Sequence, residues 1–202
     1  MPEPTTAAQR NSSLLVRGAE PADHEAIRGV VLGALAQHAG QLAPEAFSRY
    51  LDGQLDLGTH ASYGRLLVAG TDEGVRGFAA FYPDASAQGS DLPSGWADVR
   101  VLAARPGAGG HDTARALLGA CERLAAEAGA PVLAIRTASF MTDAIALYDR
   151  LGYQRVPEFD FDMASRYSEF GAPPITSLAY LRCLHPVQAS AEGARIEMRN
   201  QS

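Results

Sequence analysis

The feature that most constrains the fold is a change in hydrophobic spacing along residues 65–151. The early part contains short apolar runs separated by turns, with glycine at both ends of the turn at residues 70–74, as in a β-hairpin. Further along, apolar residues recur at three- and four-residue steps, which is typical of helices. The segments predicted in this way are strands at 65–69, 75–82, 96–104 and 132–136, and helices around 114–125 and at 142–151. Their order predicts a mixed α/β fold.

The flanking sequence extends this pattern into a single domain. Asp23 is placed to cap a helix that follows a first strand. The flanking elements are predicted as strands at 14–17, 153–161 and 177–184, and helices at 24–38 and 44–57. We therefore expect one domain over residues 13–186, with disordered ends at 1–12 and 187–202, where no periodicity is found.

The composition limits where in the cell the protein is expected and which catalytic mechanisms it can use. The chain has 202 residues, a formal net charge of -6 and no lysine, so lysine-based covalent catalysis is excluded. Neither a membrane-spanning run nor a signal peptide is indicated, and we expect a cytoplasmic protein without a nucleic-acid or membrane partner. Cys121 and Cys183 are interpreted as reduced core residues, and the dispersed histidines predict no metal site. The acidic balance mildly favours a cationic substrate.

Two motifs carry a family resemblance. Residues 100–118 combine a strand, a loop begun by Pro106 and a helix, and resemble the acetyl-CoA motif of the GNAT family of N-acetyltransferases. Residues 144–153, which include Tyr148, are similar to the family's second motif, and the resemblance covers residues 14–162. It implies a central twisted mixed sheet flanked by helices, and acetyl-CoA as acyl donor. The cofactor-binding residues that it implies are Leu102, Ala103, Ala104, Gly109, Gly110, His111, Asp112, Thr113, Ala114 and Arg115.

The loop that would bind the cofactor pyrophosphate departs from the family pattern. Gly109 stands where the family usually has arginine or glutamine, and Asp112 stands where it usually has glycine. A carboxylate at a helix start accepts backbone N–H groups that otherwise hold phosphate. Asp112 is therefore either an ordinary helix cap that leaves coenzyme A room to bind, or an anion that impairs its binding. We describe the loop as degenerate on this basis.

The resemblance also implies catalytic residues. Tyr148 matches the family's general acid, which protonates the departing thiolate. For the base, Asp98 lies on the strand at 96–104, and Glu158 lies on the strand at 153–161. Strand alternation would place Glu158, Asp160 and Asp162 on one face, where they would attract a cationic amine or simply face water.

Three functions follow from these residues. The first is an acyl-CoA-dependent N-acetyltransferase that acts on a small amine by direct transfer. The second is a GNAT fold repurposed for chemistry without coenzyme A, for example in a biosynthetic pathway, and the loop from Gly109 to Asp112 favours it. The third is a non-catalytic binding module. A homodimer is compatible with each, and the acceptor is not identified.

Overall fold

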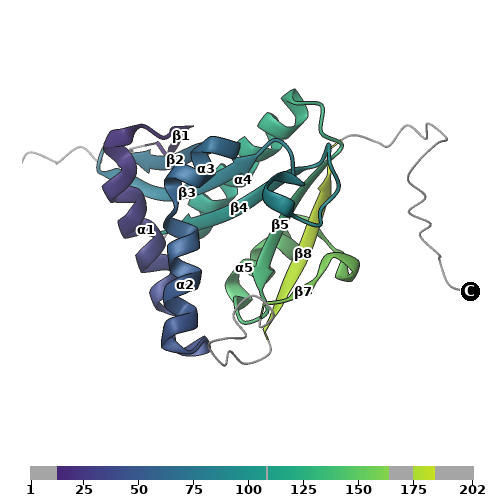
Figure 1. The fold of residues 1–202 in the computed structure, drawn as a ribbon. Helices are drawn as coiled ribbons and strands as arrows, with labels where there is room; N and C mark the ends of the chain where they lie inside the picture. Colours follow the sequence, from purple (N-terminus) through teal and green to yellow (C-terminus); the bar gives the residue numbers. More distant parts are fainter. Residues whose placement is uncertain (1–12, 108, 164–174, 185–202) are drawn as a thin grey trace, which may run out of the picture.

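The computed structural model describes residues 13–107, 109–163 and 175–184. The described strands form one eight-stranded mixed sheet in the order β1-β2-β3-β4-β5-β8-β6, with β7 paired to β8 (Figure 1). The strands are β1 (Leu15–Gly18), β2 (Arg65–Thr71), β3 (Gly74–Tyr82), β4 (Ala97–Ala104), β5 (Val132–Ala138), β6 (Gln154–Arg155), β7 (Phe161–Asp162) and β8 (Thr176–Cys183). The expected mixed α/β fold is confirmed, while the ends expected to be disordered, 1–12 and 187–202, lie outside the described residues.

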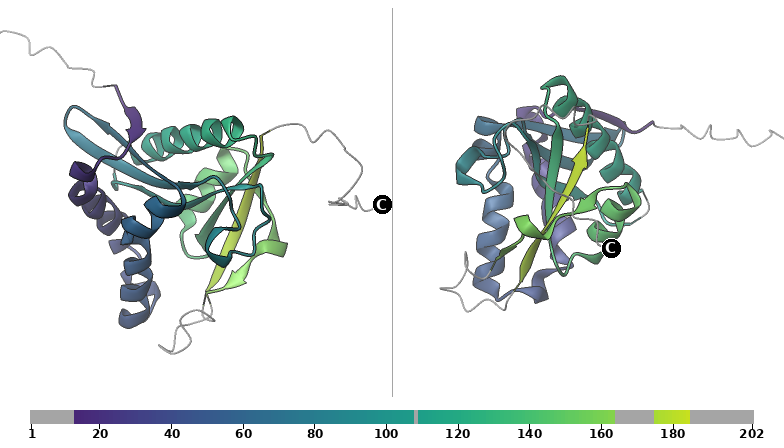
Figure 2. Two further views of the ribbon diagram at one scale, coloured as in Figure 1. Left: turned by 45° about the horizontal axis from the view of Figure 1, so that its top comes forward. Right: turned by 90° about the vertical axis from the view of Figure 1, so that its right-hand side faces the viewer.

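Five α-helices of the described residues flank this sheet. They are α1 (His24–Ala36), α2 (Pro44–Leu55), α3 (Leu57–Tyr63), α4 (Gly110–Glu127) and α5 (Thr142–Arg150). Side chains of β3 alternate between the two faces, so that Phe78 packs with α1 and Phe81 packs with α4 and α5. Figure 2 shows α4 on the opposite side of the sheet from α1. Each face of the sheet therefore has its own hydrophobic core.

The middle of the sheet is interrupted in two ways. Ala80 pairs with Val101 while the next residue, Phe81, pairs with Val99, so that Arg100 is an extra residue in a β-bulge. On its other side, β4 pairs with β5 in parallel only over residues 97–99 and 133–135. Beyond Val99 the two strands part, and among the described residues β4 is paired there only with β3, so that its edge toward β5 has no strand partner.

Two sequence predictions about secondary structure are wrong. The single helix predicted at 44–57 ends at Leu55, and a separate helix, α3, follows, with Asp56 accepting the Thr59 N–H at its start. The long strand predicted at 153–161 is broken, because Pro157 begins a 3₁₀ turn over Pro157–Phe159. The common face of carboxylates predicted on that strand therefore does not form.

Three smaller observations concern the cysteines, the metal-ligating side chains and the length of the helices. Cys121 is buried, and burial raises the pKa of its thiol to about 12, whereas Cys183 is exposed and is not a core residue. Among the described residues, no cluster of metal-ligating side chains occurs. In the same residues, no helix combines the length and the apolar character needed to cross a bilayer.

Candidate active site

The parting of β4 and β5 opens a cleft of about 300 Å³ between α1, α4 and α5. Its lining includes Leu102, Ala103 and Ala104 of β4, together with Tyr148 of α5. Gly110, His111 and Ala114 at the start of α4 complete one end. Unpaired main-chain groups of a strand bind an extended ligand as an added strand would. The cleft therefore has the form needed to hold an extended, amide-containing arm.

The end of this cleft is the N-terminus of α4. Gly109 is the N-cap residue with a φ of 90°, a left-handed conformation that glycine adopts without strain. The Gly110 N–H bonds the Gly107 carbonyl and the Thr113 N–H bonds the Gly109 carbonyl, which leaves the N–H groups of His111 and Asp112 without a carbonyl inside the helix. Such a helix start attracts anions through its free N–H groups and its dipole.

Asp112 is not the helix cap that was one of the two arrangements considered from the sequence. The N-cap is Gly109, so the interpretation of Asp112 as the helix cap is wrong. Its carboxylate instead accepts a hydrogen bond from Arg115 Nη2 at 3.1 Å, and both side chains are mostly exposed. The carboxylate therefore lies beside the anion-binding end of α4 without occupying its N–H groups. Neither Asp112 nor Arg115 lines the described cleft.

The remaining predicted cofactor residues fall into a neighbouring hollow. Gly109 and Thr113 line a cavity of about 260 Å³ beside the cleft, together with Arg105, whose Nε donates to the Val75 carbonyl at 3.0 Å. Thr113 is buried and its hydroxyl donates to the Gly109 carbonyl at 2.8 Å. This bond fixes the loop that precedes α4. The end of helix α1 and the turn after it also contribute to the cleft, the turn through His38, which the sequence analysis did not identify because no local pattern links it to β4.

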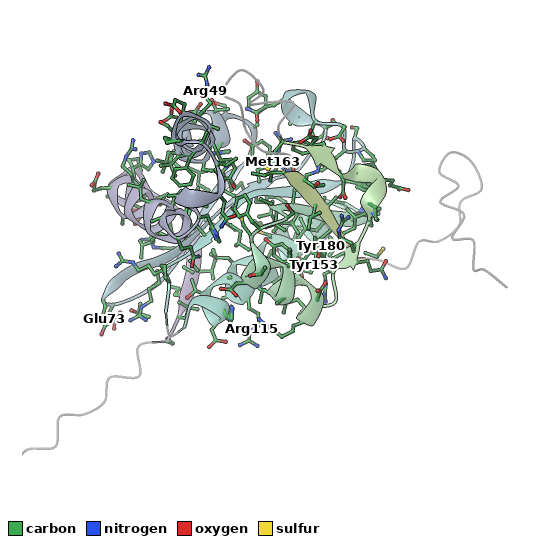
Figure 3. The ribbon with its side chains drawn as sticks, turned by 90° about the horizontal axis from the view of Figure 1, so that it is seen from below. Arg49, Glu73, Arg115, Tyr153, Met163 and Tyr180 are labelled. Atoms are coloured by element: carbon green, nitrogen blue, oxygen red, sulfur yellow. The ribbon has the colours of Figure 1, made fainter. Side chains whose placement is uncertain are left out.

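Tyr148 is only 3% exposed and lies among aromatic neighbours. Its ring centroid is 5.4 Å from that of Tyr180 and 5.9 Å from that of Tyr153, and Figure 3 labels these two residues. Burial raises the pKa of Tyr148 well above its ordinary value, and the phenols of Tyr50 and Tyr180 act in the same direction. The hydroxyl is thus protonated at neutral pH, as a proton donor must be.

A second pocket, of about 310 Å³, lies at the adjoining part of β4 and is called the acceptor pocket below. Residues 98–100 of β4 line it, whereas residues 102–104 line the first cleft. Tyr50 of α2 also lines the acceptor pocket. The two hollows therefore follow one another along β4, on either side of the point where it leaves β5.

Asp98 is the predicted base that the structure places in this pocket. It is 5% exposed, and burial raises the pKa of its carboxyl, although Arg100 and Arg136 act in the opposite direction. Arg100 Nε donates to Asp98 Oδ2 at 3.0 Å. His60 lies in the same lining, where its two ring nitrogens bond Tyr82 Oη at 2.8 Å and the Gly53 carbonyl at 3.1 Å.

The other carboxylates lie elsewhere. Glu158 is exposed in the 3₁₀ turn and lines neither the cleft nor the acceptor pocket, while Asp162 is exposed in β7. Asp160 is paired with Arg155 and accepts the Ala179 N–H at 2.9 Å, so it ties β8 to the preceding turn. The structure does not bring these three residues together with Tyr148 or Asp98.

The sequence analysis did not identify two polar residues of the acceptor pocket. Arg136 and Thr137 lie in β5, in a run that is otherwise apolar. A charged residue in a central strand was the available signal for Arg136, since buried arginine requires partners. Arg136 Nη2 donates to Asp91 Oδ1 at 2.6 Å and to the Phe159 carbonyl at 3.0 Å.

Comparison with solved structures shows the same fold in acetyltransferases. PaiA N-acetyltransferase from Thermoplasma acidophilum, in complex with coenzyme A, is 13% identical with a TM-score of 0.63, over 85% of this chain and 99% of that one. YncA from Salmonella typhimurium, with acetyl-CoA as its cofactor, is 18% identical with a TM-score of 0.57, and the match covers 87% of this chain and 96% of that one. An N-acetyltransferase from Staphylococcus aureus Mu50 is 15% identical with a TM-score of 0.59, and the match covers 86% of this chain and 100% of that one.

Comparison at the level of sequence identifies the family. No curated protein matches the chain significantly. The model of the acetyltransferase (GNAT) family matches residues 34–153, which is more than half of the chain and includes both motifs, the diverging end of β4 and the start of α4. The chain therefore belongs to the GNAT acetyltransferase family.

Proposed function

We propose that this protein transfers an acetyl group from acetyl-CoA directly to the amine of a small molecule. The observation that carries the proposal is the placement of two hollows on consecutive stretches of one strand. Residues 102–104 of β4 line a cleft that ends at a helix N-terminus, and residues 98–100 line a pocket with a buried carboxylate. The first suits a thioester with a pyrophosphate group and the second suits an acceptor.

The residues divide the reaction between them. The amine nitrogen attacks the thioester carbonyl, a C–N bond forms and the C–S bond breaks. Tyr148, protonated and buried in the cleft wall, donates its proton to the departing thiolate. Asp98 is the base that takes the proton lost by the amine, directly or through water. Burial helps it in this role because its raised pKa makes the carboxylate a better proton acceptor.

Isothermal titration with acetyl-CoA and with free coenzyme A tests the donor half of the proposal. Micromolar binding supports it, and a panel of amines monitored by release of the coenzyme A thiol then tests transfer. The carboxylate of Asp112 beside the start of α4 favours a second candidate, a GNAT fold used without coenzyme A. Lack of detectable binding at millimolar acetyl-CoA would overturn the first candidate and leave the second.

A further inference from the structure

The acceptor pocket contains two buried polar atoms without hydrogen-bond partners. Among the described residues, the buried side-chain nitrogen and oxygen atoms that lack a hydrogen-bond partner are Arg136 Nε and Thr137 Oγ1. Both residues line the pocket. Thr137 is 6% exposed. Buried donors are nearly always paired, and an unpaired donor on a charged group is the most costly kind. The two atoms therefore mark the wall of the pocket where hydrogen-bond partners are missing.

The net charge of the residues that line the pocket is opposite in sign to the net charge of the whole chain. Its charged residues among the described lining are Asp98, Arg100 and Arg136. Arg100 is fully engaged, since its Nε bonds Asp98 and its Nη atoms bond Gln88 and two backbone carbonyls. Asp98 and Arg100 therefore offset one another, and Arg136 leaves the lining with one net positive charge. This argues against the purely cationic substrate that the acidic composition favours.

The pairing of Arg136 leaves its Nε without a partner, while Nη2 donates to Asp91 and to the Phe159 carbonyl, so a ligand carboxylate that uses both nitrogens has to displace Asp91. Its carboxylate partner, Asp91, is outside the pocket lining and has a side chain that is 56% exposed. Water screens a pair of this kind, so it is weak. The guanidinium forms two parallel hydrogen bonds to a carboxylate more readily than any other side chain does.

We infer that the acceptor is an amino acid, whose carboxylate binds Arg136 while its amine faces the diverging end of β4. This inference deepens the proposed function and rests on it. The Thr137 hydroxyl supplies a further donor. Phe161, Met163 and Ala138 also line the pocket, which favours an amino acid with an apolar or aromatic side chain.

The test measures binding and transfer for matched ligands. The probes are the twenty L-amino acids, together with phenethylamine, tyramine and isoamylamine, which are phenylalanine, tyrosine and leucine without the carboxylate. Binding is measured by calorimetry in the presence of free coenzyme A, and transfer is measured with acetyl-CoA by thiol release. At least one amino acid is expected to bind about tenfold or more tightly than its decarboxylated partner, as a charged hydrogen-bonded contact predicts.

Four variants locate the contact. Arg136→Gln should remove the preference for the carboxylate, and Arg136→Lys should restore only part of it, because lysine keeps the charge without the fork. Asp91→Asn should tighten amino-acid binding, since it removes a competing anion while keeping Arg136. Arg123→Gln, on the exposed side of α4, is the matched control and should change nothing. The effect of Asp91→Asn keeps the test valid even where Arg136→Gln does not fold.

The outcomes separate the inference from the proposed function. Equal binding of amino acids and their decarboxylated partners would overturn the inference, and so would equal losses for both classes in Arg136→Gln. Binding of acetyl-CoA with no binding of any amino acid would also overturn it, while the proposed function stands. Arg136-dependent binding of amino acids without acetyl transfer would support the inference and count against the proposed function.

Discussion

Arg100 and Asp98 lie two residues apart on β4, and the guanidinium donates to the carboxylate with 3.0 Å between Nε and Oδ2. Both side chains are largely buried, at 17% and 7% exposed. The same guanidinium lies over the Tyr82 ring, 4.2 Å from its centroid, and bonds the Ala85 and Ala87 carbonyls. The bulge at Arg100 thus anchors the loop after β3 and fixes the buried carboxylate in the acceptor pocket.

Replacing Arg100 by glutamine is expected to destabilise the fold by about 3–5 kcal/mol, because it leaves the Asp98 charge buried without its partner. Urea denaturation measures the loss. The pKa of Asp98, which burial already raises, should rise further, so the folded variant binds a proton more tightly and regains stability as the pH falls. The double variant Asp98→Asn/Arg100→Gln should lose less than the sum of the two single variants; additive losses would show that the pair is not coupled.

Tyr148→Phe should lower kcat about a hundredfold while the KM for acetyl-CoA stays the same, because only the proton donor is removed. Steady-state kinetics by thiol release gives both constants. Tyr180→Phe is the matched control, since its ring packs against Tyr148 but it lines neither the cleft nor the acceptor pocket. If Tyr148→Phe retains full kcat, the assignment of Tyr148 as the acid is wrong.

Asp112→Asn should strengthen coenzyme A binding several-fold and weaken the helix, two effects of opposite sign. The carboxylate lies in the first turn of α4, where its interaction with the helix dipole stabilises the helix by about 0.3–1 kcal/mol. The same negative charge repels a phosphate. Calorimetry at low and high salt measures the affinity, and the gain should shrink with salt because the side chain is exposed. Unchanged affinity at low salt would show that Asp112 does not oppose the pyrophosphate. An arginine at Gly109 is a poorer test, because a φ of 90° strains any other residue.

Gly77→Ala is expected to destabilise the protein by about 1–3 kcal/mol through overpacking. A Cβ at Gly77 would lie 2.4 Å from Thr113 Cγ2 and 2.9 Å from Leu117 Cδ1, so α4 would have to move away from β3. Gly119→Ala is the control on α4, where a Cβ has only one neighbour, at 3.8 Å, and helix propensity should add about 0.5–1 kcal/mol of stability. Thermal denaturation of both variants compares the two; equal melting temperatures would show that β3 and α4 pack more loosely than described.

Some of the fold was predictable because its signals are local. The strands around the hairpin and the helices with apolar stripes, such as α4 and α5, require only spacing along the chain. Helix α3 was missed because its sequence LGTHASY has no apolar period, and its position depends on the Asp56 cap and on the buried bonds of His60. The strand predicted at 153–161 failed at Pro157, where a proline turn takes precedence over the alternation of polar and apolar residues.

The candidate site was also predictable only where its signals are local in the sequence. The resemblance named Leu102–Ala104 as cofactor-binding residues and Tyr148 as the acid, and in the structure these residues line one cleft. Arg136 reaches the acceptor pocket only because β5 lies next to the bulged strand, a relationship between distant segments that no local pattern contains. The conformation of Asp112 depended on its neighbour Arg115, whose competition for the carboxylate the capping rules do not include.

The parting of β4 from β5 has a consequence for how such a protein diversifies. A donor held by main-chain groups along residues 102–104 depends little on which side chains those residues carry. The acceptor pocket, in contrast, is lined by side chains from α2, α3, β4, β5 and the loop after β3. Under the proposed function, mutations in the acceptor half can therefore change the acceptor without rebuilding the site of the thioester.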